Sequence, residues 1–238
     1  MITLLQNTIL CTAVLATVVG AQSQALAEVS FSSSPPIGMS VRADGSLEAD
    51  EHGYRARFDQ TGATLRTQHA TNSNHEVALS LRLVDQMRGH SRQTITPCDA
   101  MLRGNKLARY SHAGITERYE LTRGGFEQSF VIAERPPGNG DLVLGIAAHS
   151  PTLLAPATKA AHQALVFADQ SGNAIRFGEA VVFDRGGAPL PIDTRYDGIG
   201  RIELIVPGAF LEGATYPVVV DPFVGEFSSP ISTFTDSN

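Results

Sequence analysis

Glycine, proline and aspartate divide the chain at such short intervals that few segments could form a helix of more than two turns. Its 238 residues include 22 glycines and 13 prolines. One turn pattern, Asp-x-x-Gly, recurs at Asp50–Gly53, Asp59–Gly62, Asp169–Gly172 and Asp184–Gly187. The aspartate can accept a hydrogen bond from the backbone two residues on, and the glycine can take the left-handed conformation that closes a type I turn with a bulge. The pattern therefore predicts four hairpins.

Between the turns, apolar and polar residues alternate with the period of two that is typical of half-buried strands. The alternation is visible from Leu47 to Leu65 and again from Val77 to Val84. Thr122–Gly125 is a further turn signal, and Pro136–Gly140 predicts a loop. Beyond residue 76 we expect strands at 77–84, 107–110, 115–121, 126–132, 142–148, 164–168, 174–177, 180–184, 194–196, 201–206 and 216–220.

Helix is expected to be nearly absent. Pro151–Ala164 is rich in alanine and leucine, but Pro151 and Pro156 confine any helix there to a turn or two, so we predict a connection. A helix over the polar segment 85–94 is a weaker alternative to an extended segment. The sequence thus predicts an all-β fold, an antiparallel β-sandwich, with a barrel or two packed β-subdomains as alternatives.

The last predicted strand, Tyr216–Val220, is flanked and interrupted by proline. Pro217 and Pro222 have no N–H to donate to a neighbouring strand, and proline in sheets is confined to edges, first residues or bulges. We therefore predict that this strand lies at the edge of a sheet.

The first 27 residues predict a cleaved signal peptide. Leu4–Ala21 is uncharged and mostly apolar, and Ala25–Ala27 has the small-x-small pattern of a cleavage site. The apolar run is short of a transmembrane span of about 20 residues. Cys11 lies inside that run and away from the cleavage site, which does not fit a lipidated cysteine. One departure is the missing positive charge, since no lysine or arginine precedes Arg42. We expect a secreted or cell-surface protein with no membrane span after cleavage.

Composition predicts four segments. After the signal peptide (1–27), residues 28–44 form a Ser/Pro-rich arm and residues 45–224 the β-sandwich module. Residues 225–238 are expected to be a flexible tail or a linker to further domains that follow Asn238.

Charge and cysteine content exclude two classes of protein. The formal net charge is −6, without the clustered lysines and arginines that nucleic acid requires. Cleavage leaves Cys98 as the single cysteine, so the fold cannot depend on an internal disulfide. We interpret Cys98 as a half-buried small residue beside Pro97, with pairing between molecules as the alternative.

Several strings of residues carry a resemblance to a known kind of module. They are Gly114–Tyr119, Gly125–Phe130, Arg176–Gly178, the hairpin Asp184–Pro191 and the closing strand Tyr216–Pro222. The chain resembles, over residues 45 to 224, an uncharacterised N-terminal β-module of large secreted bacterial surface proteins. In those proteins adhesion-type or repeat domains usually follow the closing strand. The resemblance implies a β-fold and an extracellular location, and it carries no catalytic or binding residues.

Common catalytic motifs are absent from the sequence. It contains no Gly-x-Ser-x-Gly, His-Glu-x-x-His, Cys-x-x-Cys or Gly-rich phosphate loop. We assign no catalytic, cofactor-binding or metal-binding residue and expect no cofactor.

The histidines lie mostly in polar, turn-like contexts, where we expect them to be solvated. They are His52, His69, His75, His90, His112, His149 and His162. A zinc site is the alternative, built from His69, His75 and Glu76 if the loop between the histidines folds back.

Two carboxylate pairs, Glu48 with Asp50 and Asp193 with Asp197, are candidates for an acid/base pair, although solvated turn ends are the simpler interpretation. Calcium binding by the Asp-x-x-Gly turns is a weaker alternative. An EF-type loop needs several carboxylates and a distal glutamate, whereas each turn offers one or two.

The leading hypothesis is therefore an exported structural or interaction module that acts through its surface without turnover, its partner being unknown. One alternative is a hydrolytic, carbohydrate-active β-protein that uses paired carboxylates. The other is a glycan-binding sandwich, for which Tyr110, Tyr119 and Tyr196 are the candidate stacking rings.

Overall fold

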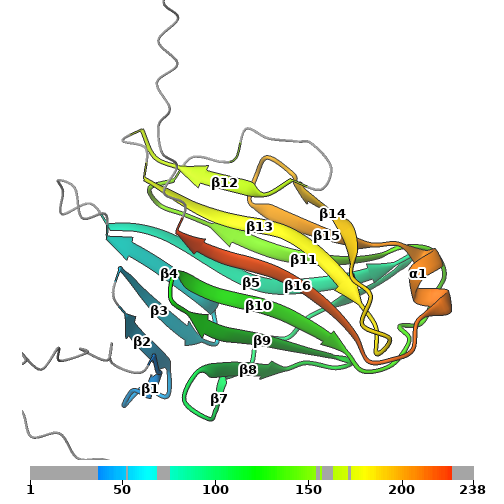
Figure 1. The fold of residues 1–238 in the computed structure, drawn as a ribbon, viewed down its shortest axis with the longest axis horizontal. Helices are drawn as coiled ribbons and strands as arrows, with labels where there is room; N and C mark the ends of the chain where they lie inside the picture. The colour runs from blue at the N-terminus through cyan, green and yellow to red at the C-terminus, as the bar shows by residue number, and fades with distance from the viewer. Residues whose placement is uncertain are drawn as a thin grey trace, which may run out of the picture. The chain divides into compact units, whose positions relative to one another are not determined.

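Sixteen strands and one short helix make up the part of the chain that the computed structural model describes, residues 37–51, 53–68, 76–153, 156, 163–170 and 173–226 (Figure 1). The strands are β1 (Ser40–Val41), β2 (Leu47–Glu51), β3 (Tyr54–Asp59), β4 (Gly62–Gln68), β5 (Glu76–Arg88), β6 (Ser91–Thr94), β7 (Met101–Arg103), β8 (Leu107–Ser111), β9 (Ile115–Thr122), β10 (Gly125–Ile132), β11 (Leu142–His149), β12 (Leu165–Ala168), β13 (Ala174–Phe183), β14 (Leu190–Tyr196), β15 (Arg201–Val206) and β16 (Val218–Glu226). The helix is α1 (Gly208–Gly213). The predicted all-β fold with almost no helix is confirmed.

All strands belong to one antiparallel sheet that is nearly closed into a barrel. The strand order is β1-β2-β3-β4-β5-β11-β15-β14-β13-β16-β10-β9-β8-β7, with β6 added to β5 and β12 to β13. β14 connects the two halves of the sheet. Its first part, Leu190–Ile192, pairs with β13, and its second part, Asp193–Tyr196, pairs with β15. At the opposite end the amide of Met39 donates a 2.7 Å hydrogen bond to the carbonyl of Asn105.

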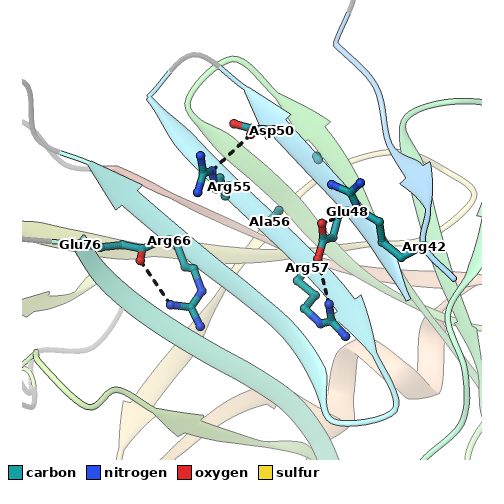
Figure 2. A pocket seen from close by; sticks show the side chains of 9 residues that line it. Arg42, Glu48, Asp50, Arg55, Ala56, Arg57, Arg66 and Glu76 are labelled. Carbon is teal, nitrogen blue, oxygen red and sulfur yellow. Dashed lines mark hydrogen bonds and ion pairs between the residues drawn. The ribbon is translucent and has the colours of Figure 1, made fainter. Parts of the chain in front are cut away.

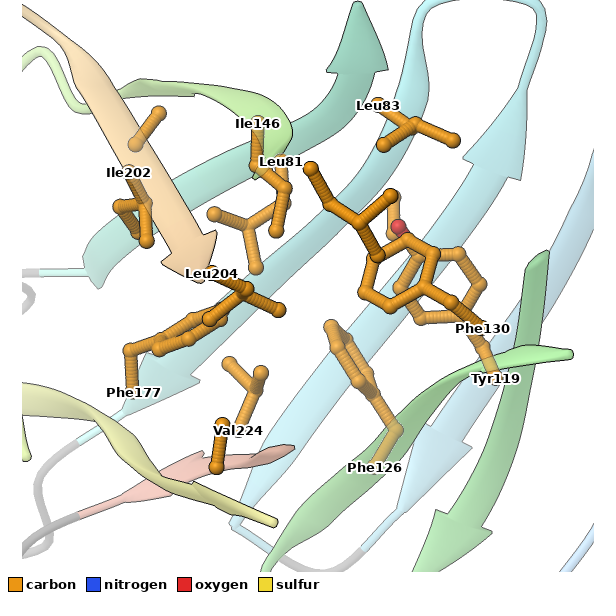
Figure 3. Close-up of a cluster of buried hydrophobic side chains, with 14 of the residues drawn as sticks. Leu81, Leu83, Tyr119, Phe126, Phe130, Ile146, Phe177, Ile202, Leu204 and Val224 are labelled. Carbon is orange, nitrogen blue, oxygen red and sulfur yellow. The ribbon is translucent and has the colours of Figure 1, made fainter. Parts of the chain in front are cut away.

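The apolar residues that alternate along the strands meet inside the sheet (Figure 3). Leu81 and Leu83 of β5 and Ile146 of β11 face Phe126 and Phe130 of β10 across this core. All five side chains are buried. The alternation in the sequence therefore places one apolar face of every long strand against the same core, which holds the fold together by removing apolar surface from water.

All four Asp-x-x-Gly segments join consecutive antiparallel strands, as predicted. In the β3–β4 turn, Asp59 Oδ1 accepts hydrogen bonds from the amide and hydroxyl of Thr61, and Gly62 has a φ of 111°. In the β13–β14 turn the amide of Gly187, φ 83°, donates to the carbonyl of Asp184. Aspartate and glycine thus have the local roles that the pattern implied.

The prediction that the closing strand lies at an edge is wrong. β16 pairs with β10 on one side and with β13 on the other. Pro222 is tolerated there because the β13 ladder shifts register between Phe177 and Ala180, directly beside it, and the β10 ladder is interrupted between Glu127 and Phe130. A bulge in the neighbour removes the demand for the missing N–H.

Other segments also differ from the expectation. The polar segment 85–94 completes β5 and turns at Gly89 into β6, so no helix forms there. The strands predicted at 174–177 and 180–184 are one bulged strand, β13. The helix lies at Gly208–Gly213, where only a break between strands was expected.

The predicted segment boundaries stay predictions. β1 lies within the predicted arm (28–44) and β16 extends into the predicted tail (225–238). The predicted signal peptide, 1–27, and most of the segment 151–164 lie outside the described residues.

The β9–β10 hairpin offers a stringent test of the register. A Cβ on Gly125, whose φ is 149°, would collide with the carbonyl oxygen of Val224 in β16, whereas a Cβ on the adjacent Gly124 would meet nothing within 4 Å. We expect Gly125→Ala to lower the free energy of unfolding by more than about 1 kcal/mol and Gly124→Ala to leave it nearly unchanged. Urea denaturation of the two variants measures this. Equal midpoints would contradict the β10–β16 pairing.

Candidate functional site

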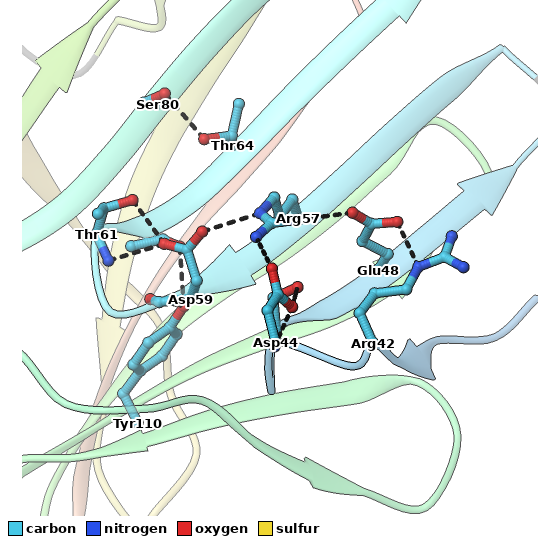
Figure 4. A network of polar contacts seen from close by, with 11 residues as sticks. Arg42, Asp44, Glu48, Arg57, Asp59, Thr61, Thr64, Ser80 and Tyr110 are labelled. Carbon is cyan, nitrogen blue, oxygen red and sulfur yellow. Dashed lines mark hydrogen bonds and ion pairs between the residues drawn. The ribbon is translucent and has the colours of Figure 1, made fainter.

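A row of charged side chains crosses the outer surface of the β2–β3 hairpin (Figure 4). Arg57 donates to Asp44, Glu48 and Asp59 at distances of 2.7, 2.8 and 2.9 Å. Arg42 donates to the other oxygen of Glu48. Burial alone would raise the pKa of Glu48, but the hydrogen bonds from Arg42 and Arg57 outweigh it and lower that pKa. These side chains hold one another in a fixed, charged arrangement.

The neighbouring part of the same surface is a shallow depression of about 470 Å³ (Figure 2). We call it the arginine face; its charged residues are Arg42, Arg55, Arg57, Arg66, Glu48, Asp50 and Glu76. In the register of β3 and β4, Arg55 lies directly opposite Arg66. Two like charges directly opposite each other on one face of a sheet destabilise it.

The carboxylates beside these two arginines hold them only loosely. Arg55 Nε lies 3.3 Å from Asp50, and Arg66 Nη1 lies 3.4 Å from Glu76. Charge-assisted hydrogen bonds are usually about 2.7 to 2.9 Å long, as those of Arg57 are. Both arginine side chains are more than half exposed. The guanidinium groups of Arg55 and Arg66 are therefore open to an anionic group from outside.

A second polar group lies inside the fold, between the β6–β7 loop and β8, β9 and β10. Cys98 Sγ lies 3.7 Å from His112 Nδ1, and His112 Nε2 lies 3.2 Å from Glu117 Oε2. The second oxygen of Glu117 accepts hydrogen bonds from the hydroxyl of Tyr119 at 2.6 Å and from Gln128 Nε2 at 3.0 Å. We call these five residues the Cys98 array.

Burial increases along the Cys98 array from the thiol inward. Cys98 is half-buried, the side chains of His112 and Glu117 are 6% and 4% exposed, and Tyr119 is fully buried. Burial raises the pKa of Tyr119 well above its ordinary value, and the charge of Glu117 adds to this. Burial also raises the pKa of the Cys98 thiol, together with the charges of Glu117 and Asp99, against the hydrogen bond to the Ser111 carbonyl.

A third polar group joins β5 to β15 across β11. The carboxylate of Asp85 accepts two hydrogen bonds from Arg201, at 2.7 and 2.8 Å, and one from Arg92 at 2.6 Å. A Cβ on Gly145, which lies opposite Asp85 in β11, would collide with the Arg201 guanidinium. Because Gly145 has no side chain, the Arg201 guanidinium can pass over it and reach Asp85.

The Asp85 group makes stability depend on pH. Burial alone would raise the pKa of Asp85, but hydrogen bonds from Arg201 and Arg92 outweigh it and lower that pKa. A carboxyl with a depressed pKa stabilises the fold above its unfolded pKa, about 3.9, and loses that contribution as pH falls through the folded value. We expect Asp85→Asn to cost about 2 to 3 kcal/mol at pH 7 and progressively less below pH 4.

Urea denaturation of Asp85→Asn and the unchanged protein at pH 7 and pH 3 measures this difference. The control is Asp50→Asn, which removes an exposed pair and should cost less than about 1 kcal/mol. A cost for Asp85→Asn that is the same at both pH values would contradict the linkage.

The predicted carboxylate pairs do not form facing pairs. Glu48 is bound by Arg42 and Arg57, and Asp50 lies beside Arg55. Asp197 Oδ1 accepts three backbone N–H bonds that shape the β14–β15 turn, from residues 199, 200 and 201. Asp193 lies 3.2 Å from Arg195. Each carboxylate has a local structural role.

The proposed zinc ligands His69 and His75 lie outside the described residues, as do His52 and His162. Within the described ranges, no three histidine, cysteine, aspartate or glutamate side chains are grouped so as to hold a metal ion. His90 and His149 are exposed, as predicted. For His112 the general expectation of a solvated histidine is wrong, because its ring packs parallel to Tyr110 with the centroids 6.3 Å apart and bonds to Glu117.

The candidate stacking rings are mostly inaccessible. Tyr110 and Tyr119 are buried, and the hydroxyl of Tyr110 donates to the carbonyls of Asp59 and Gly62. Tyr196 is half-buried and meets Phe167 edge to face at 5.7 Å. Two of the three rings therefore serve the core and cannot stack on a sugar.

The Cys98 array was not predicted, although one signal for it is present in the sequence. In β9 the inward positions are Ile115, Glu117, Tyr119 and Leu121, so a glutamate occupies a core position of an otherwise apolar alternation. A carboxylate at such a position needs polar partners. The identity of those partners depends on the pairing of β8, β9 and β10.

Comparison of the chain with protein-family models, with curated proteins and with solved structures found no match. In the part of the chain that the structure describes, no helix is long and apolar enough to cross a lipid bilayer.

Proposed function

We propose that the protein is an exported interaction module that binds a carboxylate-bearing protein surface through the arginine face, without catalytic turnover. The observation that carries this proposal is that Arg55 and Arg66, whose backbones are paired in the register of β3 and β4, both have exposed side chains on the same face of the sheet. An external carboxylate between them would relieve their repulsion. Arginine also binds carboxylates in a bidentate manner that gives geometric specificity.

The mixture of charges on the arginine face favours a protein partner over a uniform polyanion. Four arginines and three carboxylates line the depression, so a complementary surface must carry both signs. The formal net charge of the whole chain is −6, which repels a polyanion at long range. Binding to such a surface is expected to weaken as salt concentration rises.

The fold provides a rigid support for the arginine face. We infer that the two halves of the sheet pack on each other as the two layers of a sandwich. In support, Phe58 of β3 packs against Tyr119 of β9 and Phe126 of β10, with ring centroids 5.3 and 5.7 Å apart. The hairpin that presents Arg55 is thus fixed from behind by the opposite layer.

Export of the protein rests on the apolar segment 4–21 and the pattern at Ala25–Ala27. The resemblance to modules of bacterial surface proteins agrees with it. N-terminal peptide mapping of protein recovered from the culture medium is expected to find Glu28 as the first residue. A cell-retained protein that still begins at Met1 would contradict export.

The proposal competes with a hydrolase that uses paired carboxylates, and an activity screen separates the two. We expect the exported protein to show no turnover on glycan, ester or peptide substrates. Turnover that is lost on Glu48→Gln or Asp193→Asn, in variants with unchanged unfolding midpoints, would overturn the proposal in favour of the enzyme.

A further inference from the structure

The Cys98 array has the order of groups that activates a nucleophilic thiol: nucleophile, base and orienting acid. Cys98 is partly exposed, His112 Nδ1 lies 3.7 Å from its sulfur, and Glu117 lies 3.2 Å from the other ring nitrogen. The three residues come from a loop, a strand end and a strand, and the fold alone brings them together.

We propose that Cys98 is an exchange-competent thiol that forms a mixed disulfide with an external, positively charged disulfide, and that His112 takes up its proton. This goes beyond the proposed function, because it assigns a covalent contact to a thiol that is not part of the arginine face.

In the proposed step, Cys98 Sγ attacks one sulfur of the external disulfide. A new S–S bond forms to Cys98 while the original S–S bond breaks. His112 Nδ1 accepts the thiol proton and passes it to the departing sulfur, which leaves as a thiol. Cys98 is oxidised from thiol to disulfide and the departing sulfur is reduced, so the external disulfide is the oxidant and electrons balance.

Glu117 acts as a positioning residue. An ionised Glu117 accepts a hydrogen bond from His112 Nε2–H and thereby selects the tautomer that leaves Nδ1 free to accept a proton. Tyr119 and Gln128 hold the other oxygen of Glu117, so the carboxylate and the ring are fixed before an external disulfide arrives.

A base is needed because the thiol does not ionise readily. Its pKa is raised by burial and by the charges of Glu117 and Asp99. A thiol of high pKa is a strong nucleophile once its proton is removed. A neighbouring base that removes the proton during attack is therefore expected to increase the reaction rate of Cys98 strongly.

The immediate partners of the sulfur favour exchange with a disulfide over acyl transfer. Within the described residues they are the Ser111 carbonyl and the His112 ring. Exchange develops charge on sulfur alone, whereas acyl transfer also requires N–H donors for an oxyanion. Cys98 is also the only free cysteine of the described part of the chain, so the disulfide must come from outside.

The charge next to Cys98 in the sequence favours a cationic partner. The charge of the neighbouring Asp99 acts on the thiol, and Asp99 also lines a depression of about 210 Å³ that holds three carboxylates and one guanidinium, those of Asp44, Asp59, Asp99 and Arg57. A net negative surface attracts a cationic reagent and repels an anionic one.

The test measures the second-order rate of reaction with cystamine, a dicationic disulfide, at pH 7 by mass spectrometry. The protein used begins at Glu28, the N-terminus expected after export, so Cys98 is its only cysteine, and a peptide of residues 94–102 is the unstructured reference. We expect the folded chain to react at least about tenfold faster than the peptide, and His112→Asn to lose at least about tenfold in rate. A folded chain that reacts more slowly than the peptide overturns the proposal without any variant.

Two further variants separate the chemistry from damage to the fold. Glu117→Gln keeps the size of the side chain and should also slow the reaction when the rate is measured well below the unfolding midpoint of the variant. Asp99→Asn should lower the rate with cystamine relative to the neutral bis(2-hydroxyethyl) disulfide by at least about threefold. A Glu117→Gln rate equal to that of the unchanged chain would overturn the positioning role of Glu117, and an unchanged ratio between the two disulfides in Asp99→Asn would overturn the role of charge.

Discussion

Replacing Phe58 by alanine is expected to lower the free energy of unfolding by about 3 to 5 kcal/mol. The Phe58 ring is fully buried and contacts Tyr119 and Phe126 on the opposite side of the core. Its removal forfeits both the burial of the ring and two aromatic contacts, and leaves a cavity that packed strands cannot close. Urea denaturation measures the change as a lower midpoint with an unchanged slope.

The matched control for Phe58→Ala is Ile199→Ala in the β14–β15 turn. Ile199 is 91% exposed, so its truncation should change the free energy of unfolding by less than about 0.5 kcal/mol. If Phe58→Ala cost no more than Ile199→Ala, the two halves of the sheet would not pack on each other as described.

Replacing Arg88 by alanine is expected to cost about 3 kcal/mol, because a single buried side chain fastens α1 and the 136–140 loop to β5. Arg88 is 2% exposed and donates to the carbonyls of Pro136 and Gly140 and to Glu212 of α1. Truncation leaves the buried Pro136 carbonyl without this donor and removes a long packed side chain. Denaturation again measures the loss.

Arg135→Ala provides the control for Arg88→Ala, since Arg135 binds the same carboxylate from the solvent side. Its side chain is 48% exposed, and its pair with Glu212 at 2.9 Å should contribute less than about 1 kcal/mol. Equal losses for the two arginines would mean that burial of Arg88 adds nothing to the attachment of α1.

Local chemistry explains what could be predicted from the sequence. The Asp-x-x-Gly turns and the strand alternation depend on residues within a few positions of one another, so the hairpins and most strands followed directly. The β9–β10 hairpin, with Thr122 paired to Gly125, lies where the turn signal placed it. The helix α1 could not be predicted from local sequence, because no N-cap side chain bonds its first turn. Its attachment depends instead on Arg88 and Asp141, which are distant in the sequence.

Features that depend on pairing between distant strands could not be predicted. Pro222 suggested an edge strand because local rules forbid proline inside a sheet, but the bulge that tolerates it lies in β13, about 40 residues earlier. The Cys98 array likewise needs Cys98, His112 and Glu117 to be brought together by a loop and two strand pairings. The proximity of Arg55 and Arg66 also depends on the register of β3 and β4.

The proposed interaction is tested most directly by a binding titration of the purified protein on intact cells that produce it, at low and high salt. We predict saturable, salt-sensitive binding that is lost in the double variant Arg55→Ser, Arg66→Ser. The control double variant Arg103→Ser, Arg195→Ser makes the same change in net charge at exposed positions outside the arginine face and should bind like the unchanged protein. Equal binding by both double variants, or no saturable binding at all, would contradict an interaction module that acts through this face.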